Sequence, residues 1–372
     1  MSDKQMSSNV ISLQENERLV SDQSEVCNLF NDYFINIAND LSESTMLENL
    51  NCKSLFDHYV NHADIKFIKE QSNVLPGSCF SFSQVSVFDT NKKLKSLKSN
   101  KACGYDLISA DFLKLGAEVI CHSLTYVINI CLKNDVFPSE CKYAEVSPVY
   151  KKNNQLLKNN YRPVSVLTAM SKIFEGILCD QLMSFFQGKL SVMLSAYRSK
   201  YSCSNVIMKC VEDWRLSIDG REKVGCVAMD LSRAFDSVPH GLLLAKLNAY
   251  SISINSCVFL KSYLSNRMQR VKVSDKKSEW SFIKRGIPQG SLMGPVLFNI
   301  FVNDLVVRLQ DVCSIYNYAD DNTLSYCHKD TEIVKQNLEK VCHAAVQWFA
   351  RNHMMANPDK FQFMIISNKN DH

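Results

Sequence analysis

The feature that most constrains the fold is an apolar run that ends in a carboxylate, residues 224–230 (VGCVAMD). An uninterrupted apolar run of this length is typical of a strand buried on both faces of a sheet. A charge at the end of such a strand must be paired, protonated or bound to a metal ion. Asp230 is therefore a candidate catalytic residue, although an aspartate in this place can also be a simple helix cap.

A second constraint comes from residues 315–326 (IYNYADDNTLSY), where two β-prone runs flank a turn. The pattern predicts a hairpin with the adjacent carboxylates of Asp320 and Asp321 at its tip. Neighbouring like charges repel each other, and a divalent cation would convert that repulsion into binding. An exposed acidic turn is the simpler alternative for this segment taken alone.

Between these two segments, residues 285–295 (RGIPQGSLMGP) predict a glycine-rich loop that leads into a helix. Glycines allow the backbone to approach a ligand closely, Ser291 can cap the helix, and Pro295 is tolerated in a first turn. Such a loop suits a phosphate or a sugar-phosphate chain.

The rest of the chain predicts an α+β protein. Of its 372 residues, 46% are apolar and 22% are charged, which is ordinary for a globular protein. Helical patterns at 26–41, 106–132 and 172–186 do not alternate strictly with the strand patterns at 146–150 and 161–167. The net charge of +4 permits a nucleic-acid partner, and five lysines crowd into residues 92–101, where a solvated helix face is an equally good interpretation.

The cysteines and the N-terminus indicate an intracellular protein of the nucleus or cytoplasm, or both. The 15 cysteines are scattered without a Cys-x-x-Cys pair, which argues against a zinc site and against a disulfide framework. Residues 1–10 lack the apolar core of a secretory signal. The longest uncharged stretch, 286–303, is interrupted by glycines and prolines, so we expect a buried strand-turn-helix there and no membrane span.

Taken in order, three sets of residues resemble palm motifs A, B and C of reverse transcriptases: Asp230 with Phe235, then 288–290 (PQG), then 318–321 (YADD). The similarity is closest to LINE-type (non-LTR) retrotransposons and covers roughly residues 90–366. Further blocks that resemble this family are 101–114 (KACGYDLISADFLK), 147–152 (SPVYKK), 160–165 (NYRPVS), 172–175 (KIFE), 234–240 (AFDSVPH) and, as motif D, Trp348, Asn352 and 357–360 (NPDK).

The resemblance implies an RNA-directed DNA polymerase that adds dNTPs to a primer 3′-hydroxyl during retrotransposition, with template RNA and primer DNA as partners and no zinc or membrane. It implies that Asp230, Asp320 and Asp321 hold two Mg²⁺ ions, for which Mn²⁺ can substitute. Phe235 matches an aromatic steric gate against ribonucleotides. The remaining implied contacts are Lys151 or Lys152, Arg162, Gln289 and Lys360 with the incoming dNTP, and Gly290, Ser291 and Tyr318 with the template-primer.

The resemblance also implies a right-hand architecture of palm and fingers, with an antiparallel palm sheet backed by helices. We assign 1–90 to a helical N-terminal extension, 91–222 to the fingers and 223–372 to the palm, with part of 237–285 assignable to the fingers instead. Little sequence remains for a thumb, and we expect a truncated element without the endonuclease and the cysteine-histidine knuckle. The sequence does not indicate an oligomeric state.

There are three alternatives to an active LINE-type reverse transcriptase. A truncated copy could bind RNA or primer-template without turnover. An RNA-dependent RNA polymerase is disfavoured because Phe235 would exclude ribonucleotides. Group II intron maturases share the palm motifs, but the finger blocks fit them less well.

Overall fold

The computed structural model describes residues 10–36, 47, 49–72, 79–357 and 360–368. Helices and strands are mixed along the chain, and most strand pairs are antiparallel. The chain forms two compact units, each built from three separate stretches of sequence. Unit 1 comprises residues 1–42, 81–181 and 254–294, and unit 2 comprises residues 43–80, 182–253 and 295–372.

Unit 1 contains a mixed sheet with helices packed against it. Its elements are β1 (Leu13–Glu15), β2 (Arg18–Val20), α1 (Gln23–Asn36), α5 (Val87–Lys95), α6 (Ala110–Leu115), α7 (Ala117–Lys133), β3 (Tyr143–Tyr150), β4 (Tyr161–Leu167), α12 (Ile254–Leu264), β7 (Arg267–Val273), β8 (Lys276–Lys277) and β9 (Ser281–Ile283), together with most of α8 (Ala169–Phe186). The strand order is β4-β3-β7-β8, and β9 also pairs with β7. The β3–β4 pair is antiparallel and the β3–β7 pair is parallel. The strands predicted at 146–150 and 161–167 are thereby confirmed.

Helix α1 covers one side of this sheet, as expected for a helix with a single apolar face. Asp22 begins the helix by accepting the N–H of Glu25 at 2.8 Å. Phe30 is fully buried and meets the edge of the Tyr161 ring, with centroids 4.9 Å apart. The described part of α1 runs to Asn36, and the predicted apolar positions Ile37 and Leu41 lie outside the described residues.

The helical pattern predicted over 106–132 is two helices, not one. Ser109 caps α6 by accepting the N–H of Phe112 at 3.1 Å, so residues 106–109 precede the helix. Gly116 ends α6 and precedes the first residue of α7. The helical pattern predicted over 106–132 is confirmed for residues 110–115 and 117–132, with a break at Gly116.

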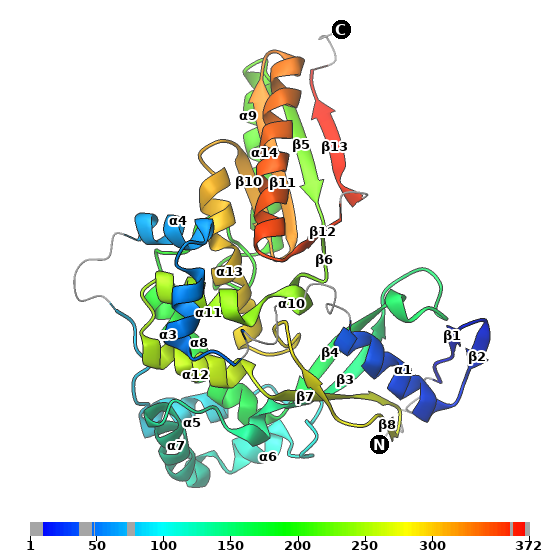
Figure 1. Ribbon diagram of the computed structural model, residues 1–372, viewed down its shortest axis with the longest axis vertical. Helices are drawn as coiled ribbons and strands as arrows, with labels where there is room; N and C mark the ends of the chain where they lie inside the picture. Colours follow the sequence, from blue (N-terminus) through cyan, green and yellow to red (C-terminus); the bar gives the residue numbers. More distant parts are fainter. Residues whose placement is uncertain (1–9, 37–46, 48, 73–78, 358–359, 369–372) are drawn as a thin grey trace. The chain divides into compact units, whose positions relative to one another are not determined.

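Unit 2 is organised around a four-stranded antiparallel sheet with the order β10-β11-β5-β13 (Figure 1). Its elements are α3 (Cys52–Tyr59), α4 (Ala63–Gln71), α9 (Cys203–Asp219), β5 (Lys223–Met229), β6 (Leu231–Ser232), α10 (Ala234–Ser237), α11 (His240–Ala249), β10 (Ser314–Tyr318), β11 (Asp321–His328), α14 (Thr331–Arg351), β12 (Met355–Ala356) and β13 (Gln362–Ile366), together with most of α13 (Met293–Leu309). The predicted strand at 224–229 is confirmed, except that Ala228 is exposed.

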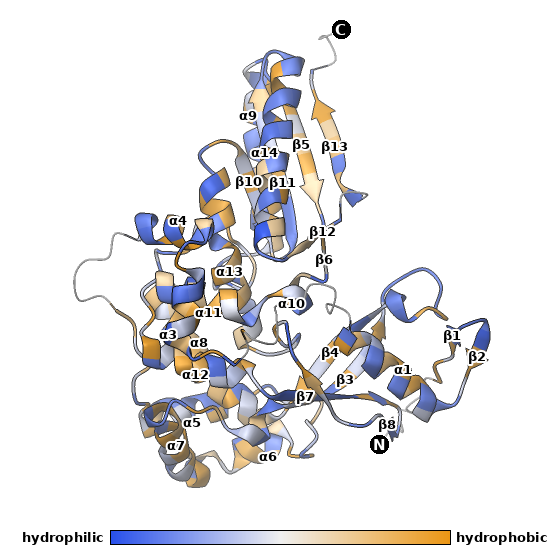
Figure 2. Ribbon diagram, in the orientation of Figure 1, coloured by the Kyte–Doolittle hydropathy of each residue, from blue (hydrophilic) through white to orange (hydrophobic). Residues whose placement is uncertain are grey.

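Helices lie on both faces of the unit 2 sheet. Helix α14 packs on β11 and β5, and a Cβ at Gly225 would come within 2.4 Å of the Val334 Cγ1 atom. Tyr316, on the opposite face by strand alternation, donates its hydroxyl hydrogen bond to Asp213 of α9 at 2.9 Å. The outward side of α14 is mostly hydrophilic (Figure 2), as expected for a helix with one face on a sheet.

Buried ion pairs and a buried hydrogen bond link the helices of unit 2. Asp64 of α4 is fully buried and accepts a 2.7 Å hydrogen bond from the side chain of Asn352. A guanidinium nitrogen of Arg308 lies 3.1 Å from the same carboxylate. Lys246 and Asp304 form a second ion pair at 2.7 Å, with both side chains fully buried. Burial of this kind stabilises only while each charge keeps its partner.

All 15 cysteines are free thiols. Among the described residues, no helix is both long enough and apolar enough to span a bilayer.

Candidate active site

The pairing of β5 with β11 brings two of the predicted catalytic carboxylates to the same end of the sheet. In this antiparallel ladder Asn322 lies opposite Met229. The next positions along the two strands are Asp321 and Asp230, so the register places them side by side. Both are at least partly exposed, Asp321 more than Asp230. Two carboxylates that are distant in the chain are therefore neighbours in space.

The third carboxylate lies in the turn between β10 and β11. Tyr318 pairs with Asp321, which leaves Ala319 and Asp320 as a two-residue turn, and Ala319 has a φ of 59°. The predicted hairpin is confirmed, with the difference that Asp321 already belongs to β11. A positive φ in the first turn position is typical of tight hairpins.

A pair of buried amides holds this turn from within. The side chain of Asn317 donates to the Ala319 carbonyl at 3.0 Å and to the Asn322 side-chain oxygen at 2.9 Å. Asn322 in turn donates to the Asp320 carbonyl at 3.2 Å. Both amides are at most 5% exposed, so the backbone that carries Asp320 is fixed by the protein alone.

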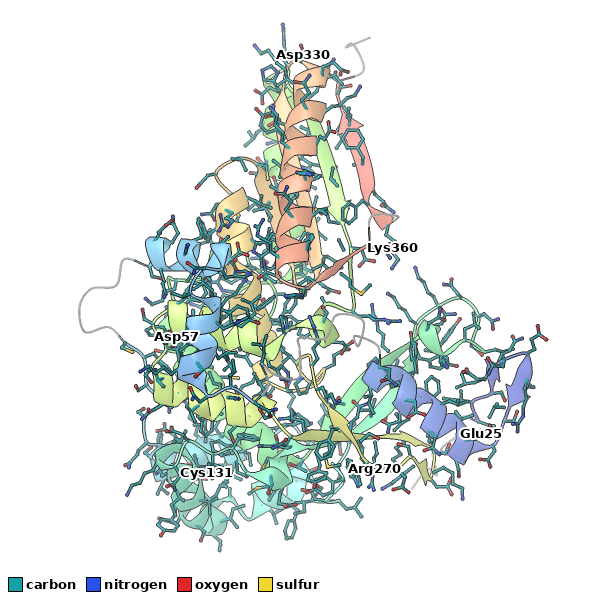
Figure 3. The ribbon with its side chains drawn as sticks, viewed as in Figure 1. Glu25, Asp57, Cys131, Arg270, Asp330 and Lys360 are labelled. Carbon is teal, nitrogen blue, oxygen red and sulfur yellow. The ribbon has the colours of Figure 1, made fainter. Side chains whose placement is uncertain are left out.

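A cation of the protein contacts the first carboxylate. The Lys360 ammonium lies 3.0 Å from Oδ2 of Asp230, and both side chains are accessible to solvent. Lys360 immediately precedes Phe361 and β13, at the end of that strand nearest β12 (Figure 3). The Asn357 N–H also donates to the Asp230 carbonyl at 3.2 Å. Pro358 and Asp359 of the predicted motif D lie outside the described residues.

The donor chemistry fits Mg²⁺, because carboxylate oxygens are the ligands that this hard cation prefers. The three aspartates offer such oxygens at one end of one sheet. In the described part of the chain no three His, Cys, Asp or Glu side chains already surround a common point at metal-binding distance. The strand register therefore places these carboxylate-bearing positions next to one another.

Aromatic rings stand beside the carboxylates. Phe235, in the short helix α10, stacks on Phe298 of α13 with centroids 4.5 Å apart and planes 19° from parallel. The Tyr197 ring meets Phe235 edge-on at 6.2 Å. Burial raises the pKa of the Tyr197 hydroxyl, and the negative charge of Asp320 raises it further. Tyr197 therefore lies near both Phe235 and Asp320.

Tyr197 was missed by sequence reasoning. Its φ of 59° is uncommon for an aromatic residue and indicates local strain. The segment is held by the Ala196 carbonyl, which accepts the side-chain N–H of Asn299 at 2.8 Å. No periodicity or turn signal in the sequence around Tyr197 indicates this position.

The predicted basic residues gather at one end of the β3–β4 hairpin of unit 1. Tyr150 pairs with Tyr161 and Val149 with Arg162, while Lys151 and Lys152 follow directly after β3. The Lys151 N–H donates to the Asn160 carbonyl at 2.8 Å, which continues the pairing. Lys151, Lys152 and Arg162 are all exposed. The hairpin thus brings these three cations together.

The glycine-rich loop of unit 1 lies directly on β4. The Gln289 carbonyl accepts the N–H of Ser165 at 2.9 Å. Gly290 has a φ of 108°, and a Cβ there would be 2.3 Å from the Ser165 carbonyl oxygen. Ser291 caps α13, since its hydroxyl oxygen accepts the Gly294 N–H at 2.8 Å, and it is 5% exposed. The predicted cap is confirmed, and the Ser291 hydroxyl is committed to the loop itself.

The predicted site residues fall into two sets. Unit 2 carries Asp230, Phe235, Tyr318, Asp320, Asp321 and Lys360, and unit 1 carries Lys151, Lys152, Arg162, Gln289, Gly290 and Ser291. Tyr318 is 37% exposed next to the acidic turn. Strand pairing brings Asp230, Asp320 and Asp321 together in unit 2, and Lys151, Lys152 and Arg162 together in unit 1.

The sequence matches the family model described as reverse transcriptase (RNA-dependent DNA polymerase) over residues 149–370. That match covers more than half of the chain and includes every predicted site residue. The chain therefore belongs to the reverse transcriptase family.

Several of the similar proteins come from mobile elements. The probable RNA-directed DNA polymerase from transposon BS of Drosophila melanogaster is 27% identical over 286 residues, which is 74% of this chain and 31% of that protein. The RNA-directed DNA polymerase from mobile element jockey of Drosophila funebris is 25% identical over 287 residues, again 74% of this chain and 31% of that protein. The chain thus spans about a third of the length of these relatives, and its resemblance to LINE-type (non-LTR) reverse transcriptases is confirmed.

Proposed function

We propose that this chain catalyses RNA-templated addition of deoxynucleotides to a primer 3′-hydroxyl, as the polymerase part of a retrotransposition protein. The observation that carries the proposal is the register of β5 and β11, which makes Asp230 a neighbour of Asp321 beside the turn of Asp320. Family membership and the polymerase names of the relatives support the same activity.

We propose that unit 2 contains the palm and that unit 1 contains the fingers. The four-stranded antiparallel sheet of unit 2 carries the three aspartates, and helix α14 packs on it. The β3–β4 hairpin and the glycine-rich loop of unit 1 carry the cations and backbone groups suited to a triphosphate. The boundaries at 1–90, 91–222 and 223–372 stay predictions.

Asp230, Asp320 and Asp321 would hold two Mg²⁺ ions, with Mn²⁺ as a substitute. Such ions lower the pKa of the primer hydroxyl and neutralise charge on the leaving pyrophosphate. Lys360, whose ammonium contacts Asp230 at 3.0 Å, would lie close enough to this site to contact the departing phosphates. This ion pair is exposed to solvent, and exposed ion pairs are weak.

The other side chains select and orient the substrate. Phe235 excludes the 2′-hydroxyl of a ribonucleotide. The Phe298 ring stacks on the Phe235 ring and limits how far it can move away from the sugar. Lys151 or Lys152 and Arg162 bind the triphosphate by charge, and Gln289 contacts the nucleotide or the template base. The template-primer is bordered by Gly290, Ser291 and Tyr318. Ser291 contacts it through its backbone, because the Ser291 hydroxyl caps α13.

The implied partners are template RNA, primer DNA and dNTPs. Template sequence would be read by base pairing, while the protein contacts phosphates and shape. We also propose a nuclear or cytoplasmic location, where reduced thiols persist and the 15 cysteines remain free.

Primer extension tests the proposal directly. The purified chain is incubated with poly(rA)/oligo(dT), dTTP and Mg²⁺, beside an Asp320→Asn control that removes one carboxylate charge at unchanged volume. We expect extension by the wild type and loss of at least about a hundred-fold in rate by the control. Equal extension by both proteins would contradict the assignment of Asp320.

A second candidate is a module that binds RNA or primer-template without turnover. It is favoured by the contact of Lys360 with Asp230, which occupies one of the carboxylates proposed to hold metal. Fluorescence anisotropy with labelled poly(rA)/oligo(dT) separates the two functions. Binding without extension at any Mg²⁺ or Mn²⁺ concentration supports this second candidate.

A further inference from the structure

Glu175, on helix α8, is a fully buried carboxylate far from the aspartates in sequence. Three hydrogen-bond donors point at it. Oε2 accepts the backbone N–H of Leu292 at 2.7 Å, and Oε1 accepts the hydroxyls of Tyr263 at 3.1 Å and Ser171 at 3.3 Å. Burying a carboxylate is costly, so a side chain kept there has a specific task.

The donor Leu292 lies at the end of the glycine-rich loop, directly before α13. The first N–H groups of a helix have no partner within the helix, and a negative charge near them is favourable. Glu175 provides both the acceptor and the charge for Leu292, while Ser291 accepts the N–H of Gly294. The C-terminal end of the loop is therefore held by two side chains at once.

The other end of the loop is held by β4. Ser165 donates its N–H to the Gln289 carbonyl at 2.9 Å, and the absence of a side chain at Gly290 allows the close approach. Gln289 thus stands three residues before the amide that Glu175 binds. A loop this short, bound at both ends, leaves the Gln289 backbone little freedom.

The two oxygens of a carboxylate suit these three partners. A glutamine in its place has one acceptor oxygen, and its amide nitrogen would face a donor hydrogen. The pKa of Glu175 is raised, because burial outweighs the opposing effects of the positive charge of Arg267 and the three hydrogen bonds. Arg267 is itself 2% exposed, so its charge acts on Glu175 with little screening.

We propose that Glu175 is a positioning residue that fixes the 286–292 loop so that Gln289 meets the incoming nucleotide and template base. The inference rests on the proposed polymerase function for its final step. The anchoring of the loop by Glu175 is independent of that function and is tested separately.

The first test is hydrogen-deuterium exchange of the peptide that covers residues 286–294, in Glu175→Gln and in a control. Asp180→Asn is a matched control, because it makes the same carboxylate-to-amide change on the same helix, where Asp180 is 68% exposed and pairs with Lys93. We expect roughly ten-fold faster exchange of the loop amides in Glu175→Gln, the effect of losing one charge-assisted hydrogen bond, and no change in Asp180→Asn. Unchanged exchange in Glu175→Gln would overturn the proposal, whether or not the chain extends primers.

The second test is steady-state primer extension at a temperature where the folded fraction of both variants, measured by circular dichroism, equals that of wild type. We expect Glu175→Gln to raise KM for dTTP about ten-fold with a smaller change in kcat, and Asp180→Asn to leave both unchanged. Tyr263→Phe, which removes one of the three donors, should give an intermediate KM. If wild type extends but Glu175→Gln keeps its KM, the positioning role is wrong. If wild type does not extend, the polymerase function fails and the exchange experiment still decides the role of Glu175.

Discussion

Replacing Gly290 with alanine should separate the glycine-rich loop from β4. The glycine has a φ of 108°, a region that residues with a side chain rarely adopt, and its new Cβ would lie 2.3 Å from the Ser165 carbonyl oxygen. That oxygen belongs to a strand paired with β3 and has little room to retreat. The loop must therefore move away, which breaks the hydrogen bond from the Ser165 N–H to the Gln289 carbonyl.

The cost has two parts. Backbone strain at a positive φ costs on the order of 1–3 kcal/mol. Loss of the Ser165–Gln289 hydrogen bond adds about 1 kcal/mol. Gly290→Ala should thus lower the free energy of unfolding by about 2–4 kcal/mol, and the displaced Gln289 should reduce primer extension as well.

Gly188→Ala is the matched control, because Gly188 has a φ of 85° and no atom lies within 4 Å of the position that an added Cβ would take. It reports the strain alone, so we expect a loss of about 1–2 kcal/mol and unchanged primer extension. Urea unfolding followed by circular dichroism measures both variants. If Gly290→Ala is no less stable than Gly188→Ala, and extends primers as wild type does, the close approach to Ser165 has no energetic consequence and the reasoning is refuted.

Three further predictions concern Phe235, Lys360 and the buried ion pair of Lys246 and Asp304. Phe235→Ala should increase ribonucleotide incorporation at least about ten-fold in primer extension with rNTPs, and unchanged discrimination would contradict a steric gate. Lys360→Met should tighten Mn²⁺ binding to the nucleic-acid-free protein, measured by calorimetry, because its ammonium no longer competes for Asp230; weaker binding would show that Lys360 is no competitor. Asp304→Asn should destabilise the fold by about 3–5 kcal/mol in urea, since it leaves the buried ammonium of Lys246 without its counter-charge, and a loss below about 1 kcal/mol would contradict this.

The local parts of the site could be predicted from sequence because each depends on the residue pattern of one short segment. The apolar run that ends in Asp230 predicted β5, and the two β-prone runs around Asp320 predicted the hairpin. The mutual placement of Asp230 and Asp321 needed the ladder register, which depends on strand pairing rather than on any one segment. The division of the predicted helical segment at Gly116 was likewise not predicted from its apolar spacing.

Glu175 and Tyr197 show what a sequence pattern leaves out. Glu175 stands in a recognisable block, yet its partners Leu292 and Tyr263 come from other stretches of the chain, so its role is defined only by the fold. Tyr197 precedes α9 in a segment without periodicity, and it reaches Phe235 through tertiary contacts alone. Contacts between distant segments were the missing information in both cases.

The burial of Asp64 has a practical consequence for work with shortened versions of this protein. Its carboxylate neutralises Arg308 and binds Asn352, two residues that stand near the C-terminal ends of α13 and α14. A version that starts at residue 90, where the family resemblance begins, would lose this aspartate. The Arg308 guanidinium would lose a counter-charge, and the Asn352 amide would keep only its hydrogen bond to the Trp348 carbonyl. Trimming at the edge of recognisable homology would thus remove part of the buried interior, and poor solubility of such a fragment would reflect the cut rather than the enzyme.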